Sequence, residues 1–374
     1  MSRRQIHGPP ASALARLTEE QRTFLQSLPK AELHAHLNGC IPLACLQELA
    51  RTYVLDHDVC GPGDGDVDTD TDTDAVAIES GIEALKGGVE LEKLDDFFGL
   101  FRAVYALTAS PENLAIATRA VLQDFVGEAL AKEEGEGEER QCSYMELRST
   151  PRATPLMSRR KYVETVLDEV ERYPEERAAY ILSLNRTMGP EVASECIDIA
   201  IEMKKANRRI VAVDLCGEPL AGDMDLLEEY FRKAKQAGLG LTLHIAETEQ
   251  NTPEDTMKLL SFGPDRLGHA TFLNEEAKKY VLEHNIAIEI CLTSNLICKT
   301  VKVLDDHHLN YHFSLNHPVA ICSDDTLPFR NSLLGEYALL LAPKPYGLGM
   351  SEEDVRVIAK MSMDNRFVAR RAGL

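Results

Sequence analysis

The sequence predicts a single (β/α)8 barrel of the TIM type, and three observations carry this prediction. The chain has 374 residues, a length that one such barrel commonly reaches. Eight short apolar runs alternate with helix-length segments, which is typical of a parallel sheet covered by helices. Polar residues suited to catalysis follow several of these runs, and barrels of this type have their active sites at the carboxyl ends of the strands.

The eight expected strands are the apolar runs at 31–37, 143–147, 179–184, 210–215, 239–245, 266–270, 287–292 and 319–322. Between them, helical spacing is clearest at Leu226, Leu227, Tyr230, Phe231 and Ala234, and Gly238 stands where a C-terminal glycine cap is expected. A further exposed helix is expected over 275–284. The alternative, an open doubly wound sheet, would be favoured by a glycine-rich dinucleotide motif after the first strand, and none is present.

Two acidic segments, near 56–75 and 133–140, interrupt this alternation. The first superficially resembles a Ca²⁺-binding loop, but it lacks the glycine and the closing glutamate at the required positions. We therefore expect both segments to be solvated loop insertions within one domain that spans 1–374.

The composition excludes several functional classes. A net charge of −21 argues against binding to a nucleic-acid polymer, although a single phosphate in a pocket needs only a few local donors. The nine cysteines form no CxxC pair, which is typical of reduced thiols in a cytosolic protein. No apolar run reaches membrane-spanning length. We expect a monomeric cytoplasmic protein without a membrane partner.

Three histidines and an aspartate suggest a metal site. His34 and His36 lie two residues apart in a predicted strand, so their side chains face the same side. His244 lies near the end of the fifth run, and Asp324 follows the eighth. Each fragment is weak evidence alone, because such residues are common without a metal. Together they form a His₃Asp set that suits one Zn²⁺ per chain, with Fe²⁺ or Co²⁺ as other occupants.

Further polar residues near the same strand ends could move protons. Glu247 lies three residues beyond His244, where it could act as a general acid. His269 ends the sixth run and could orient a water molecule or stabilise an oxyanion. The group His307, His308 and His312 could be a second metal site, but it lies between strands, and we expect it to decorate a helix or loop.

Six motifs together resemble the adenosine deaminase family, over a match from about residue 25 to near the C-terminus. They are KAELHAHLNG at 30–39, VDLCGE at 213–218, LHIAE at 243–247, DRLGHA at 265–270, CLTSN at 291–295 and CSDD at 322–325. Within the family, the chain is most similar to the adenosine deaminase-like branch, the N6-methyl-AMP deaminases. The features that indicate this branch are Asn38, which replaces an aspartate of adenosine deaminases, the string ELRSTPR at 146–152, and the absence of the substrate-gate segment of adenosine deaminases.

The resemblance implies a barrel of the metal-dependent hydrolase (amidohydrolase) type with one Zn²⁺. It implies His34, His36, His244 and Asp324 as ligands, Glu247 as proton donor, and His269 with Asp324 as the groups that orient the attacking water. The implied substrate contacts are His36, Asn38, Tyr105, Ser149, Thr150, Pro151, Arg152, Asn185, Gly217 and Asp325. Two of these depart from the family, since Asn185 and Tyr105 stand where relatives carry aspartate and histidine.

We therefore expect hydrolysis at C6 of a purine nucleoside monophosphate, converting N6-methyl-AMP or a related N6-substituted AMP to IMP and an amine. Asn38 favours a nucleotide because a neutral amide does not repel a phosphate as an aspartate would. Arg152 is the better phosphate contact, because Arg148 could instead form a structural ion pair. The alternatives are an adenosine or adenine deaminase, which gives inosine or hypoxanthine, and a catalytically inactive scaffold.

Overall fold

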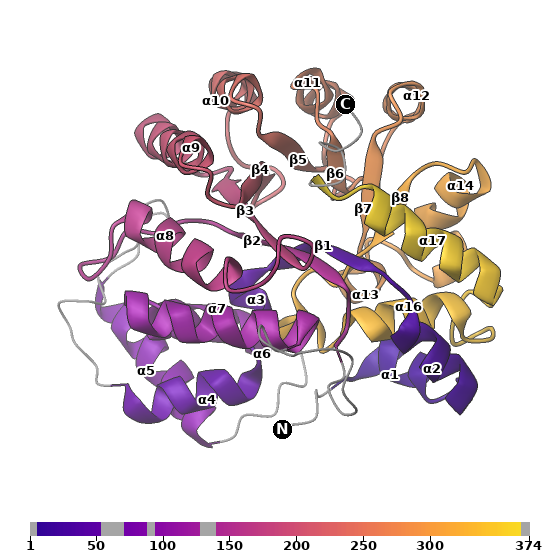
Figure 1. Cartoon of the computed structure of the whole chain (residues 1–374), viewed down its shortest axis with the longest axis horizontal. Helices are drawn as coiled ribbons and strands as arrows, with labels where there is room; N and C mark the ends of the chain where they lie inside the picture. Colours follow the sequence, from indigo (N-terminus) through magenta and orange to yellow (C-terminus); the bar gives the residue numbers. More distant parts are fainter. Residues whose placement is uncertain (1–5, 54–70, 88–93, 128–139, 368–374) are drawn as a thin grey trace.

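Eight parallel strands form a barrel with helices on its outside (Figure 1). The computed structural model describes residues 6–53, 71–87, 94–127 and 140–367. The strands are hydrogen-bonded in chain order from β1 to β8. A bridge between Ala35 and Asp324 brings the first strand against the segment that follows the last one, so the barrel is nearly closed. The predicted fold class is confirmed.

The strands are β1 (Ala31–His36), β2 (Tyr144–Ser149), β3 (Ala178–Asn185), β4 (Ile210–Cys216), β5 (Gly240–Ile245), β6 (Arg266–His269), β7 (Ala287–Ile290) and β8 (Val319–Ile321). All eight predicted strands are present, with ends that differ from the predicted ones by no more than two residues. β6 stops at His269 because His269 and Ala270 both adopt positive φ, which breaks the extended conformation.

The helices described are α1 (Gly8–Leu14), α2 (Glu19–Ser27), α3 (Leu37–Cys40), α4 (Leu43–Thr52), α5 (Thr71–Gly87), α6 (Leu94–Leu107), α7 (Pro111–Val126), α8 (Arg159–Val170), α9 (Pro190–Lys205), α10 (Met224–Gln236), α11 (Pro253–Ser261), α12 (Glu275–Glu283), α13 (Leu292–Ile297), α14 (His308–Ser314), α15 (Thr326–Phe329), α16 (Leu333–Leu341) and α17 (Glu352–Asp364). No described helix is long and apolar enough to cross a membrane.

Helix α10 confirms most of the predicted stripe. Leu227, Phe231 and Ala234 are buried against the barrel, and Gly238 follows the helix with a φ of 79°, as a C-terminal glycine does. Leu226 was wrongly placed on this stripe, since it is 55% exposed at the edge of the helix. The predicted exposed helix near 275–284 corresponds to α12.

The acidic segments lie mostly outside the described residues. This holds for residues 56–70 and 133–139, so the prediction of solvated loops there stays a prediction. Residues 71–75 were expected in the first loop, but they begin α5 instead. The short-period alternation of Asp and Thr in this stretch carries no helical signal that sequence reasoning could have used.

The barrel interior holds charged side chains, among them Arg148, for which the sequence suggested a structural ion pair. Arg148 on β2 is fully buried, and its guanidinium lies 3.3 Å from Asp214 Oδ1 and 2.8 Å from Glu289 Oε2. Arg266 reaches Glu289 and Glu146, each at 2.7 Å. Buried charges are tolerated only when they are paired, so these contacts form one mutually dependent network.

Replacing Arg148 by Met is expected to lower the free energy of unfolding by about 3–5 kcal/mol, because it leaves Asp214 and Glu289 buried without one of their partners. Chemical denaturation would measure this loss. The control is Arg160→Met, which breaks an exposed pair with Glu202 and should cost no more than about 1 kcal/mol. Equal losses in both variants would show that the Arg148 pairs add no special stability.

Candidate active site

Four potential metal ligands converge at the carboxyl ends of β1, β5 and β8. The Nε2 atom of His36 lies 3.2 Å from Nε2 of His244. Asp324 Oδ1 lies 3.7 Å from Nε2 of His36 and 3.8 Å from Nε2 of His34. Donor atoms arranged tetrahedrally around Zn²⁺ at about 2.0–2.1 Å are about 3.3 Å apart. The measured separations are therefore of the size that a single ion requires.

His34 gives an independent reason to expect a ligand. Its Nε2 atom is buried and has no hydrogen-bond partner among the described residues. Its Nδ1 lies 2.6 Å from Glu289 Oε2. Because a carboxylate accepts, Nδ1 carries the hydrogen and Nε2 keeps its lone pair, as metal binding requires. Burial and the nearby Arg148 lower the pKa of His34 well below its usual value, so the ring is neutral.

His244 is oriented in the same way by another strand. Its Nδ1 lies 3.0 Å from Oδ1 of Asp214, and Oδ2 of the same carboxylate accepts from Ser183 Oγ at 2.8 Å. Sequence reasoning assigned no role to Asp214 or Glu289. The available signal was an acidic residue in the middle of an otherwise apolar strand, a position where a charge needs a partner.

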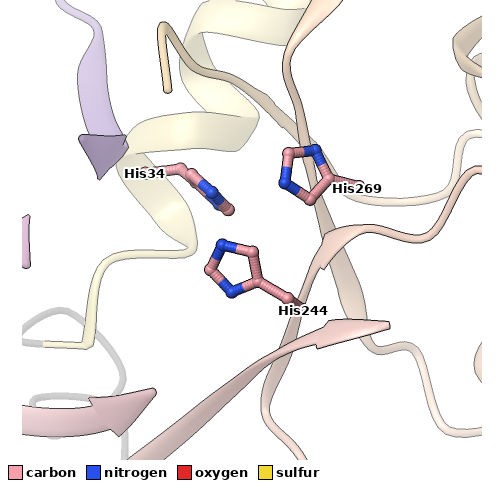
Figure 2. A group of neighbouring side chains, drawn as sticks. All are labelled: His34, His244 and His269. Carbon is pink, nitrogen blue, oxygen red and sulfur yellow. The ribbon is translucent and has the colours of Figure 1, made fainter. Parts of the chain in front are cut away.

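Figure 2 shows His34, His244 and His269 pointing toward one another from β1, β5 and β6. Their ring nitrogens, one from each, all lie within 4.8 Å of one another. A second overlapping group joins His34 and Asp324 with Cys291, which sequence reasoning did not single out. Burial and the Asp324 carboxylate raise the pKa of the Cys291 thiol well above its usual value, so it is a poor thiolate donor.

The strand exits that present these side chains have strained backbones. Ala246, His269 and Asp324 adopt φ of 47°, 60° and 62°, a region that costs non-glycine residues about 1–3 kcal/mol and is concentrated at functional sites. The exit of β8 is held by Glu32, whose carboxylate accepts from the main-chain N–H groups of His34 and Ser323 at 2.8 and 2.9 Å. The folded barrel thus maintains the unusual turn at Asp324.

Glu247 and His269 lie beside the potential ligands. His269 Nε2 lies 3.8 Å from Glu247 Oε1 and 4.0 Å from Asp324 Oδ2. The His269 side chain is almost fully buried, whereas that of Glu247 is 33% exposed, so a molecule entering from solvent can reach Glu247. The Glu247 carboxyl group, which solvent reaches, therefore lies next to the buried His269 imidazole at the edge of the cluster.

Asp325 faces the same space. Its Oδ1 atom is buried without a hydrogen-bond partner. Burial, followed by the Asp324 and Glu247 carboxylates, raises the pKa of Asp325 well above its usual value. A Cβ atom on Gly39 would lie 1.8 Å from Asp325 Oδ1, so the carboxyl group occupies the space that the glycine leaves free.

A positively charged group lies at the end of β2. The Arg152 guanidinium stacks on the Tyr105 ring at 4.1 Å and donates to Thr108 Oγ1 at 3.0 Å. Burial lowers the pKa of Arg152, and the described groups that oppose this shift are the phenols of Tyr162 and Tyr105 rather than carboxylates. This guanidinium is therefore not neutralised by a described acid, in contrast to Arg148.

Asn38, Ser149 and Arg152 all lie close to the Tyr162 hydroxyl group. Burial raises the pKa of the Tyr162 phenol, and Arg152, Ser149 and Asn38 each act against this rise because they lie close to it. The Asn38 Oδ1 atom and the Tyr162 hydroxyl oxygen are buried, and neither has a hydrogen-bond partner among the described residues. The fold thus brings Asn38, Ser149 and Arg152 together, and it adds Tyr162, which sequence reasoning missed because it lies on α8.

The remaining predicted contacts have local roles in the structure. Thr150 Oγ1 lies 3.7 Å from Cys216 Sγ, and Pro151 is buried beside it. The Asn185 amide oxygen accepts from Thr187 N and Oγ1 at 2.9 and 2.7 Å. Gly217, with a φ of 102°, lies so close to the Asn185 amide that a Cβ atom would approach it to 2.6 Å. Asn185 therefore holds the turn after β3.

The comparisons with known proteins agree with this geometry. The adenosine deaminase family model matches residues 29–372. N6-Methyl-AMP deaminase-L of Xenopus laevis is 33% identical over 334 residues, which cover 87% of this chain and 86% of that protein. The apo structure of the Arabidopsis thaliana N6-methyl-AMP deaminase is 30% identical, with a TM-score of 0.74 over 94% of this chain and 96% of that one. Arabidopsis ADAL complexed with IMP is 29% identical, with a TM-score of 0.73 over 93% and 96% of the two chains.

Proposed function

The chain belongs to the adenosine deaminase family and is a hydrolytic deaminase, and we propose that it acts on N6-methyl-AMP, giving IMP and methylamine. The observation that carries this proposal is the likeness, over nearly the whole chain, to relatives named for this substrate. The structure of a relative complexed with IMP, the product of this reaction, also supports it. Related N6-substituted AMPs are further candidate substrates, because the chemistry at C6 is the same.

The family and the histidine–aspartate cluster indicate a metal cofactor. We assign it as one Zn²⁺ per chain, held by His34, His36, His244 and Asp324. Nitrogen donors with one carboxylate suit Zn²⁺, and the buried, unpartnered Nε2 of His34 needs such a partner. When bound, the ion supplies a nucleophile by lowering the pKa of a water molecule from about 15.7 to about 7.

The surrounding side chains perform the remaining steps. Glu247 donates a proton to N1 of the purine as the water oxygen adds to C6. His269 and Asp324, whose nearest polar atoms are 4.0 Å apart, orient this water. Asp325 and Gly217 contact the purine edge, and the unpartnered Oδ1 of Asp325 supports this role. Collapse of the addition product then breaks the C6–N6 bond as the C6=O bond forms. Over the two steps the water gives up both of its protons: one replaces the proton that Glu247 gave to N1, and the other passes to N6, so that the amine leaves neutral.

The group around Tyr162 supports recognition of a 5′-phosphate. Arg152 has no described carboxylate partner, and Asn38 is neutral where an aspartate would repel the phosphate. Ser149, Thr150 and Pro151 complete this end of the ligand site. The Tyr105 ring stacks on the Arg152 guanidinium and holds it in place. Asn185 contributes its remaining amide donors to the ribose. These features favour a nucleotide over free adenosine or adenine.

Wild-type enzyme is expected to turn over N6-methyl-AMP and AMP with kcat/KM values about 10–100-fold above those for the matching nucleosides, because one charge-assisted phosphate contact is worth about 1.5–3 kcal/mol. Steady-state assays of N6-methyl-AMP, N6-methyladenosine, AMP, adenosine and adenine side by side would measure this. If adenosine is handled as well as its 5′-monophosphate, the chain is an adenosine deaminase. If none of these compounds reacts, the scaffold alternative holds.

Asn38→Asp is expected to reduce kcat/KM selectively for the phosphorylated substrate, because the new carboxylate repels the phosphate by about 1–4 kcal/mol at 4 Å. A matched control is Asn207→Asp, an exposed turn residue after α9, which should leave both substrates unaffected. An equal loss for nucleotide and nucleoside in Asn38→Asp would contradict the assignment of Asn38.

Glu247→Gln retains the shape of the side chain but removes the proton that it donates. The variant is expected to keep its metal, measured by elemental analysis, while kcat falls by about 10²–10⁴, the usual contribution of general acid catalysis. Glu249→Gln, an exposed change in the same loop, should leave kcat unaffected. Near-normal turnover by Glu247→Gln would mean that another group protonates N1.

A further inference from the structure

The turn that presents His269 needs external support. His269 and Ala270 are consecutive non-glycine residues with φ of 60° and 49°. Each such residue costs about 1–3 kcal/mol and persists only where surrounding structure holds it. Within the turn, the Ala270 N–H donates to Gly268 O at 2.8 Å. The end of β5 also holds the turn, because Ile245 O accepts from Ala270 N–H at 3.1 Å and Ala246 O accepts from Phe272 N–H at 2.9 Å. These bonds leave the carbonyl of His269 to be satisfied from elsewhere.

His308, at the start of α14, supplies this contact. Its Nε2 atom lies 2.8 Å from the carbonyl oxygen of His269. A carbonyl only accepts, so Nε2 carries the hydrogen and donates it. The ring stacks on His307, with centroids 4.3 Å apart and planes at 21°. The donor is thus held in position by a neighbouring ring.

Asn295 on α13 connects this stack to the same turn. Its side-chain oxygen lies 3.0 Å from Nε2 of His307, and Nδ1 of the same ring caps α14 by accepting from Leu309 N at 3.0 Å. The Asn295 amide nitrogen donates to Thr271 Oγ1 at 3.1 Å. Besides its main-chain bonds to the end of β5, the turn at 269–271 is therefore held at two further points, by side chains that themselves contact one another.

We propose that His308, supported by His307 and Asn295, is a positioning residue that sets the orientation of His269 through its main-chain carbonyl. The inference rests on the proposed function, in which His269 orients the attacking water. Loss of the His308 donor would let the strained turn relax and move the His269 ring. A displacement of about 1 Å of a catalytic group can cost about 10²-fold in rate.

The test compares two substitutions that separate the ring from the donor. His308→Phe keeps the ring that stacks on His307 but removes the donor, whereas His308→Gln keeps an N–H donor without the ring. His308→Phe is expected to lower kcat about 10–100-fold with KM changed less than about 3-fold, and His308→Gln to recover most of this loss. His312→Phe is the matched control, because it replaces another buried histidine of α14. Its ring lies 6.3 Å from that of His308, and its side chain makes no hydrogen bond to the described residues of the turn. It should leave kcat within about 2-fold of wild type.

Hydrogen–deuterium exchange of the peptide spanning 266–273 gives a readout that does not depend on activity or metal. Exchange should accelerate in His308→Phe and stay near wild type in His308→Gln and His312→Phe. Equal kcat losses in the Phe and Gln variants, an equal loss in His312→Phe, or unchanged exchange in His308→Phe would overturn the inference. Failure of wild-type turnover would instead overturn the proposed function, since the exchange comparison needs no substrate.

Discussion

The contact of Arg148 with Asp214 and Glu289 is the interaction on which the candidate site depends. Glu289 holds Nδ1 of His34 and Asp214 holds Nδ1 of His244, while one guanidinium lies between the two carboxylates. Burial acts to raise the pKa of both acids, but His244 and Arg148 lower the pKa of Asp214, and Arg148 and Arg266 lower that of Glu289. Both carboxylates therefore stay charged inside the barrel. Charged carboxylates accept the Nδ1 hydrogens, which leaves the opposite nitrogens free to bind a cation.

This constraint explains why charge lies where a barrel usually places apolar side chains. Burying Asp214 or Glu289 alone would carry a large desolvation cost, so the carboxylates require Arg148, and Arg148 requires them. Arg148 and Arg152, only four residues apart, consequently differ in role. Arg148 is paired with the buried carboxylates beneath the site. Arg152 has no described acidic partner, so it is available to a ligand.

Sequence reasoning predicted the strands because eight apolar runs are a local signal, and it paired His34 with His36 because strand side chains alternate. It missed Glu289, Cys291 and Tyr162, since their relevance depends on which distant strand or helix they meet, and a single sequence does not record this. Leu226 was misplaced for a related reason: helical spacing gives a stripe, but packing decides where its edge lies. His308 stood out in the sequence only as part of a histidine group, and nothing there indicated its role, because its contact is with a main-chain carbonyl.

The proposed mechanism depends on which residues bind the metal. Two groups of potential ligands share His34, and they include His269 and Cys291, which are not among the proposed ligands. Anomalous diffraction from crystals of the protein, recorded above and below the zinc absorption edge, tests it directly. We expect one anomalous peak, about 2.0–2.2 Å from Nε2 of His34, His36 and His244 and from the Asp324 carboxylate. A peak coordinated by His269 in place of His36, or by Cys291, would contradict it.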